Sequence, residues 1–158
     1  MPSIEILTEA HIDGVHTLEE LCFFEPWSQK SLELLCADGA FGVVALEDTE
    51  VLAYGGMTYV LDEGAITNIA VHPNHRRKGL GREIVKKLLS EGKDRGLDCI
   101  FLEVRESNTA ARELYLSEGF LECGIRKNFY RHPTENGVQM MYRIGEEETE
   151  DKNDSSRN

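Results

Sequence analysis

The sequence has no long apolar run, and its cysteines, prolines and aromatic residues are few. The longest apolar stretches are short, as at residues 41–46, so we expect no segment that crosses a membrane. Residues 1–5 contain neither a basic side chain nor an apolar run, which argues against a secretory signal. The four cysteines show no Cys-x-x-Cys spacing, which favours free buried thiols in a reducing cytoplasm over a disulfide framework or a zinc site.

Basic residues are also scarce, because 17 lysines and arginines stand against 29 aspartates and glutamates, for a formal net charge of −12. An acidic chain argues against nucleic acid as a partner, because phosphate binding requires a basic face. The charge suits a cationic substrate, although solubility alone also explains it. Residues 145–158 hold six acidic and two basic side chains and no apolar one, which predicts a disordered acidic tail. Residues 1–144 are long enough to form one domain with a buried core.

Hydrophobic periodicity predicts strands that alternate with amphipathic helices along these 144 residues. This order predicts an α/β (α+β) domain with a mixed sheet and helices on both faces. Ser28 and Asn108 are expected to cap helices, and Gly96 to end one. The predicted strands are 4–7, 41–46, 51–60, 65–71, 99–104, 120–127 and 138–144, and the predicted helices are 9–24, 28–36, 79–95 and 108–119.

Positive charge gathers where the strand at 65–71 leads into the helix at 79–95. The start of a helix exposes unpaired backbone N–H groups, and glycine lets a phosphate come close to them. Gly79 and Gly81 lie there, which predicts an anion site for a diphosphate. A solvated basic helix face is the simpler alternative. A Walker A loop and a dinucleotide fingerprint are both excluded, because neither glycine pattern is present. The basic side chains of this candidate site are Arg77, Lys78 and Arg82.

Arg76-Arg77-Lys78-Gly79-Leu80-Gly81 resembles the [QR]-x-x-G-x-[GA] loop of the GNAT acetyltransferase superfamily. Leu102-Glu103-Val104-Arg105-Glu106-Ser107-Asn108, together with Leu114-Tyr115 and Pro26-Trp27-Ser28, is similar to the RimI branch of that superfamily, the ribosomal-protein alanine N-acetyltransferases. The resemblance covers roughly residues 4–144. It implies the GNAT fold, with a mixed, mostly antiparallel sheet, and acetyl-CoA as the acetyl donor without a metal.

The resemblance implies that Glu103 is the general base, a role that also fits a carboxylate near the end of a buried strand. The alternative is a glutamate that forms a salt bridge with Arg105 or Arg126. Tyr115 is the implied acid for the thiolate leaving group, and a core tyrosine is the alternative.

The resemblance also implies cofactor contacts from Asn108, which could equally be a plain helix cap, and substrate contacts from Trp27 and Tyr130. Trp27 is expected to be half-buried, either beside the substrate groove or as a core anchor. His72 and His75 have H-x-x-H spacing but lack a third ligand, so no metal site is expected. The full set of implied cofactor-binding residues is Ile69, Ala70, Val71, Arg77, Lys78, Gly79, Leu80, Gly81, Arg82 and Asn108.

The resemblance implies a cytoplasmic, monomeric enzyme that acetylates the N-terminal alanine of the eighteenth small-subunit ribosomal protein, a basic protein, with no nucleic-acid or membrane partner. Two alternatives stay open: an acetyltransferase of internal lysines or small amines, and a non-catalytic acyl-CoA sensor. Glu25 and Thr67 depart from the family pattern on the amine side, which leaves the peptide preference open. A loop at 129–137 is expected to shape the peptide groove.

Overall fold

The computed structural model describes residues 2–144, so the predicted acidic tail at 145–158 lies outside the described residues. Within the described range the chain forms two compact units. Unit 1 comprises residues 2–59 and 66–90, and unit 2 comprises residues 60–65 and 91–144.

Seven strands form in the hydrogen-bonded order β1-β2-β3-β4-β5-β7-β6. Within residues 2–144, β1 with β2, β2 with β3, β5 with β7 and β6 with β7 pair antiparallel, and the start of β4 pairs parallel with β5. This confirms the mixed, mostly antiparallel sheet. The strands are β1 (Ser3–Ile6), β2 (Ala40–Glu47), β3 (Glu50–Val60), β4 (Glu63–Val71), β5 (Cys99–Arg105), β6 (Leu121–Tyr130) and β7 (Glu135–Arg143). The helices are η1 (Glu9–His11), α1 (Ile12–Cys22), α2 (Gln29–Glu33), η2 (Leu34–Cys36), η3 (Pro73–His75), α3 (Leu80–Asp94) and α4 (Thr109–Ser117).

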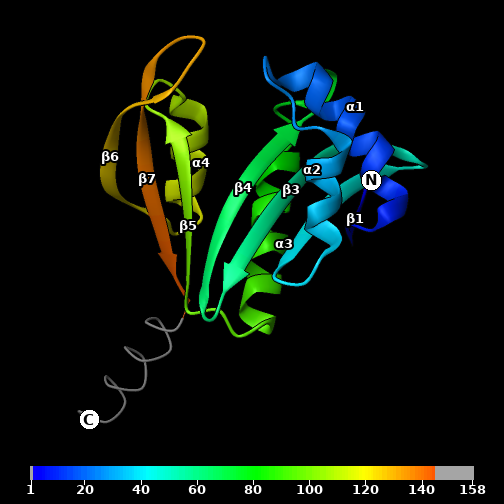
Figure 1. The fold of residues 1–158 in the computed structure, drawn as a ribbon, viewed down its shortest axis with the longest axis horizontal. Coiled ribbons are helices and arrows are strands. Elements are labelled where there is room, and N and C mark those ends of the chain that lie inside the picture. The colour runs from blue at the N-terminus through cyan, green and yellow to red at the C-terminus, as the bar shows by residue number, and fades with distance from the viewer. Residues whose placement is uncertain (1, 145–158) are drawn as a thin grey trace. The chain divides into compact units, whose positions relative to one another are not determined.

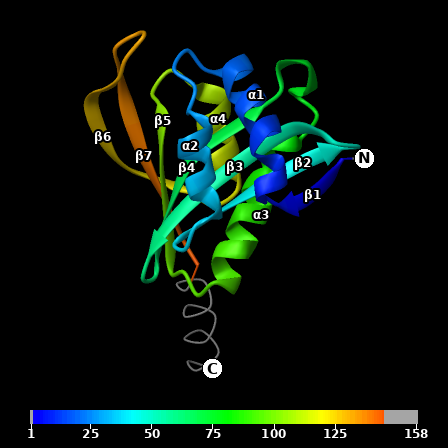
Figure 2. The same cartoon turned by 45° about the vertical axis from the view of Figure 1, so that its right-hand side comes forward.

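Two neighbouring residues of β3 show that helices cover both faces of the unit 1 sheet. Successive side chains of a strand point to opposite faces. Tyr54 reaches Glu19 of α1, whereas a side chain at Gly55 would meet Ile84 and Leu88 of α3 within 2.8 Å. The glycine therefore lets α3 pack closely against β3, while α1 covers the other face (Figures 1 and 2).

Unit 2 joins β5, β7 and β6 side by side (Figure 1). Alternate side chains of β5 are buried, at Ile100, Leu102 and Val104, which leaves Glu103 half-buried on the other face. Behind the strands, the ring of Tyr115 on α4 packs against Phe120, with 5.8 Å between ring centroids. The catalytic candidate Glu103 is therefore presented by a strand whose other face is anchored in the core.

The predicted helix boundaries hold where a cap is visible. Ser28 Oγ accepts the Ser31 N–H at 3.1 Å, and Asn108 Oδ1 accepts the Ala111 N–H at 3.2 Å. Gly96, two residues after the end of α3, has a φ of +82°, as expected of a C-terminal stop. No described helix combines the length and apolar character that crossing a bilayer would require.

Three expectations from the sequence were wrong in detail. The loop expected at 129–137 is mostly strand, because β6 continues to Tyr130 and β7 starts at Glu135. The helix expected at 9–24 begins as the short 3₁₀ helix η1 and ends at Cys22. The cysteines are free, but only Cys99 is buried, whereas Cys36 and Cys123 are exposed.

Candidate active site

The basic loop before α3 has the backbone shape that an anion site requires. Arg77 and Gly79 have φ values of +65° and +84°, and the first helical hydrogen bond runs from the Glu83 N–H to the Gly79 carbonyl at 3.1 Å. Alternating backbone handedness before a helix turns N–H groups toward one point, where an anion is stabilised. Within 4 Å of the position that a Cβ would take at Gly79 there is no atom, so the approach to these N–H groups is open.

One basic side chain of this loop is hydrogen-bonded to the backbone of β4, and two others are exposed to solvent. The Arg76 guanidinium donates from Nε to the Val71 carbonyl at 3.1 Å and lies 3.7 Å from the Cys22 sulfur. Arg77 and Lys78 are exposed, and Leu80 is buried, so Leu80 can offer a ligand only its backbone. The loop thus combines a held backbone with exposed positive charge.

A fully buried glutamate on α1, which sequence reasoning missed, ties together the segments around the candidate cofactor strand. Glu19 Oε1 accepts the backbone N–H of Trp27 at 2.9 Å, and Oε2 accepts hydrogen bonds from Tyr54 and from Asn68, the latter at 2.6 Å. Burial and the neighbouring Glu19 charge raise the pKa of Tyr54, so its phenol keeps the proton that it donates. A carboxylate at 0% exposure is tolerated because these donors replace water.

The hydrogen bonds of Glu19 reach two segments that were singled out from the sequence, at Trp27 and at Asn68. Trp27 is half-buried, as expected, and packs at the margin of the unit 1 core. Asn68 immediately precedes Ile69-Ala70-Val71 on β4, and it reaches the same face as Thr67, which lies against Gly56. Two successive residues on one face depart from strict alternation, which is typical of a β-bulge. The signal that sequence reasoning overlooked was a glutamate at an apolar-face position, four residues after Val15.

Glu103 lies on β5 opposite Gln139 of β7. Its Oε1 lies 3.1 Å from Nε of Arg126 and 3.5 Å from Nε2 of Gln139. Of the two salt-bridge partners considered from the sequence, Arg126 is therefore the one that the structure shows. Arg126 is 57% exposed, so solvent screens this pair and the pair contributes little to stability.

The two oxygens of the Glu103 carboxylate differ in their hydrogen bonding. Among the described residues, Oε2 is buried and has no hydrogen-bond partner. A side chain on Gly137 would come within 3.1 Å of this oxygen and 3.2 Å of the Phe129 ring, so the glycine preserves the space around it. A buried carboxylate oxygen without a partner is costly, which is typical of an atom whose partner arrives with a substrate or water.

One tyrosine lies within electrostatic reach of this carboxylate, and a second lies within reach of the first. Burial is the main cause that raises the pKa of Tyr130 to about 12, the Glu103 charge is the second, and the Arg105 charge partly offsets the rise. Burial, and to a smaller extent the neighbouring Tyr130 phenol, raises the pKa of Tyr115 to about 12. Both phenols therefore stay protonated at physiological pH and can donate a proton. Within unit 2, the structure thus places the predicted residue Tyr130 near Glu103 and near Tyr115.

No group of three or more His, Cys, Asp or Glu side chains suited to a metal ion occurs within residues 2–144. The H-x-x-H pair has a local structural use. His72 Nδ1 accepts the Asn74 N–H at 3.1 Å and caps η3, and the rings of His72 and His75 pack edge to face at 5.3 Å.

Residues 12–120 match the acetyltransferase (GNAT) family, a span of more than half of the chain. The chain belongs to the GNAT acetyltransferase family, whose members use acetyl-CoA. The resemblance inferred from the loop before α3 is thereby confirmed at the level of the family.

The relatives point to one branch of this family. The ribosomal protein bS18-alanine N-acetyltransferase of Escherichia coli K12 is 35% identical over 137 residues, which cover 87% of this chain and 91% of that protein. A Bacillus subtilis protein, named as a putative enzyme of the same kind, is also 35% identical, over 85% of this chain and 91% of its own. The crystal structure of the ribosomal-protein alanine N-acetyltransferase from Escherichia coli superposes with a TM-score of 0.85 at 33% identity, covering 91% of this chain and 94% of that one.

Proposed function

We propose that this enzyme transfers the acetyl group of acetyl-CoA to the α-amino group of an N-terminal alanine, and that its substrate is ribosomal protein bS18. The observation that carries the proposal is the 35% identity, over 87% of the chain, with an enzyme named for that reaction. The chemistry of unit 2 supports it, because a carboxylate with one buried, unpartnered oxygen and two protonated phenols suit the transfer of an acyl group to an amine.

The amine must lose a proton to become a nucleophile, and Glu103 is the proposed base. Its Oε2 has no hydrogen-bond partner among the described residues, so it can accept the proton directly or through a water molecule. Arg126 holds Oε1 at 3.1 Å and leaves Oε2 in place. Tyr130 and Trp27 are proposed to contact the substrate terminus.

The leaving thiolate needs a proton, and Tyr115 is the proposed acid. A buried phenol with a pKa of about 12 holds its proton across the physiological range. It can stabilise a developing thiolate by a hydrogen bond in the transition state, without a complete transfer of the proton beforehand. The aromatic contacts with Phe120 fix the direction in which this ring points.

The loop before α3 is proposed to bind the diphosphate of acetyl-CoA. Its support is the open backbone at Gly79, the left-handed residue Arg77, and the exposed cations Arg77 and Lys78. Asn108 is proposed to contact the cofactor as well as cap α4. The backbone N–H groups of residues 69–71 are proposed to stabilise the charge that develops on the thioester oxygen, as backbone donors do in other acyl transfers.

The test is mass spectrometry of peptides after incubation with the purified full chain and acetyl-CoA. A peptide that begins with the N-terminal residues of bS18 should gain one acetyl group on its α-amine. The same peptide with its α-amine blocked in advance should gain none, even when it contains lysine.

Two outcomes would favour the alternatives. Acetylation of the blocked peptide on a lysine would identify a lysine acetyltransferase. Binding of coenzyme A in calorimetry, without turnover of any amine, would identify a non-catalytic sensor. Varying the first residue of the peptide measures how strictly alanine is required.

A further inference from the structure

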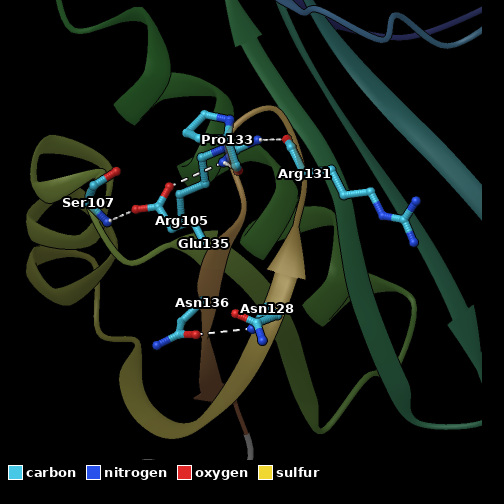
Figure 3. Close-up of polar contacts among 7 residues, drawn as sticks. All are labelled: Arg105, Ser107, Asn128, Arg131, Pro133, Glu135 and Asn136. Atoms are coloured by element: carbon cyan, nitrogen blue, oxygen red, sulfur yellow. Dashed lines mark hydrogen bonds and ion pairs between the residues drawn. The ribbon is translucent and has the colours of Figure 1, made fainter.

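Arg105 lies two residues after Glu103 on β5, on the same face of the strand, and its guanidinium holds the connection between β6 and β7. One terminal nitrogen donates to the Pro133 carbonyl at 2.9 Å and approaches Glu135 at 3.2 Å, and the other donates to the Arg131 carbonyl at 2.7 Å. Figure 3 shows these contacts converging on Arg105 from residues 131–135. The short turn between β6 and β7 is thus fixed by a side chain from the strand that carries Glu103.

The partner carboxylate extends the same network to the start of α4. The second oxygen of Glu135 accepts the Ser107 N–H at 2.7 Å (Figure 3). Hydrogen bonding from Ser107, together with Arg105, lowers the pKa of Glu135, so the pair stays charged at neutral pH. The Asn128 N–H donates to Asn136 Oδ1 at 3.0 Å, which fixes the irregular part of β6 just before Tyr130.

The Tyr130 ring lies against the flat face of the Arg105 guanidinium. The central carbon of the Arg105 guanidinium lies 4.6 Å from the centre of the Tyr130 ring. This distance is typical of a cation–π contact, and the planar shape of the group lets it stack and donate at the same time. Tyr130 pairs with Glu135 in the β6–β7 register, so the ring, the ion pair and the turn form one cluster.

We propose that Arg105 is a positioning residue for the amine substrate, because it orders Tyr130 and the β6–β7 turn beside Glu103 and thereby sets the affinity for the first residues of the peptide. This inference rests on the proposed function, in which Tyr130 contacts the substrate terminus. Arg105 itself takes no part in proton transfer, and it acts through Tyr130.

Lysine cannot replace arginine in this role. An ammonium group has no planar face to stack on Tyr130 and no rigid fork to reach two carbonyl groups and a carboxylate together. The charge near Glu103 and Glu135 would nevertheless be kept. The Arg105→Lys variant therefore separates positioning from charge.

The experiment measures kcat and KM for the bS18 N-terminal peptide and for acetyl-CoA, with thermal melting as a check on folding. In Arg105→Lys, KM for the peptide should rise about tenfold, since two charge-assisted hydrogen bonds are lost, while KM for acetyl-CoA and kcat change less than about twofold. Arg112→Lys is the matched control. Arg112 also bridges elements of unit 2, from α4 to Glu122 and to the Glu106 carbonyl, but none of its hydrogen bonds or ion pairs reaches Tyr130. Its kinetic constants should stay at wild-type values.

A double-mutant comparison tests whether Arg105 acts through Tyr130. In a Tyr130→Ala background, Arg105→Lys should raise KM for the peptide by less than about twofold further, because coupled residues are not additive. Should Arg105→Lys fail to fold, Glu135→Gln takes its place, and it should also raise KM for the peptide without changing KM for acetyl-CoA.

The outcomes separate this inference from the proposed function. If the wild-type chain does not acetylate the peptide, the proposed function fails. If it does, and the variant shows an unchanged peptide KM, a loss confined to kcat, an equal rise in both KM values, or full additivity with Tyr130→Ala, the positioning role of Arg105 is wrong.

Discussion

The carboxylate of Glu103 has two oxygens in different environments. Oε1 is held by Arg126 and Gln139, whereas Oε2 is buried, without a hydrogen-bond partner among residues 2–144, beside a glycine. The salt bridge and the catalytic role, which compete as interpretations of the sequence, are therefore compatible. One oxygen orients the group, and the other can accept a proton.

We expect Glu103→Gln to lower kcat by about 100-fold or more, because an amide cannot accept the proton of the amine. KM for acetyl-CoA and the melting temperature should stay near wild type, since the lost pair with Arg126 is largely exposed to solvent. Steady-state kinetics near pH 7 and a thermal melt measure these effects. Glu122→Gln removes a different carboxylate from an arginine pair of unit 2 and serves as control. A full rate in Glu103→Gln would remove Glu103 from the base role.

At the scale of single residues, motifs in the sequence led to the candidate site, whereas a residue defined only by tertiary contacts was missed. Glu103, Tyr115 and Tyr130 were all named from the sequence; the structure places Tyr130 near Glu103 and near Tyr115, and the roles of the three residues stay predictions. Glu19 was missed, because a glutamate within an amphipathic helix is usually solvated. Only the donors from Trp27, Tyr54 and Asn68, distant in sequence, explain why it is buried.

Among the elements, the loop before α3 carries the prediction on cofactor binding. Gly79 and Gly96 have almost the same φ, at +84° and +82°, and a Cβ at either position would meet no atom within 4 Å. They differ in that one precedes the first turn of α3 and the other follows its last turn. The same substitution at Gly79 and at Gly96 therefore separates the effect of backbone strain from the effect of a blocked anion site.

We expect Gly79→Val to raise the Kd for acetyl-CoA at least about tenfold, because the side chain would cover the N–H groups that bind phosphate and the backbone would resist its left-handed conformation. Gly96→Val should cause similar strain and a similar loss of melting temperature, with the Kd unchanged. Isothermal calorimetry with coenzyme A measures both variants. Equal losses of affinity in the two would mean that strain alone explains the effect, and the loop would not be the diphosphate site.

Element boundaries show where periodicity stops being informative. The strands of the core were predicted to within a few residues, because their apolar runs are bounded by turns. The β6–β7 hairpin was predicted too short, because residues 121–130 are largely exposed and lack apolar alternation. Its strand conformation is specified by pairing with β7 and by contacts of Arg105 and Asn136, which a linear pattern does not contain.

At the scale of the whole molecule, the formal net charge of −12 acts over longer distances than any single contact. An acidic enzyme attracts a basic peptide before contact, and salt weakens this attraction as the screening length shortens. Charge of this kind changes the rate of encounter more than the chemistry that follows.

We expect kcat/KM for a lysine-rich N-terminal peptide to fall about threefold or more between about 0.05 M and 0.5 M NaCl. A peptide with the same first residues, but with its lysines replaced by glutamine, should change less than about twofold over the same range. Initial rates at low peptide concentration measure this ratio. Parallel salt dependence for the two peptides would show that the acidity serves solubility alone.

The chain crosses between its two units three times, after residues 59, 65 and 90. Residues 60–65, which include the first three residues of β4, belong with the later part of the sequence, and the rest of β4 belongs with the earlier part. A single splice point therefore cannot exchange one unit for its counterpart from a related enzyme. A hybrid enzyme designed to transfer peptide preference must therefore exchange residues 60–65 together with the segment from residue 91 onward, which includes the hairpin that contains Tyr130.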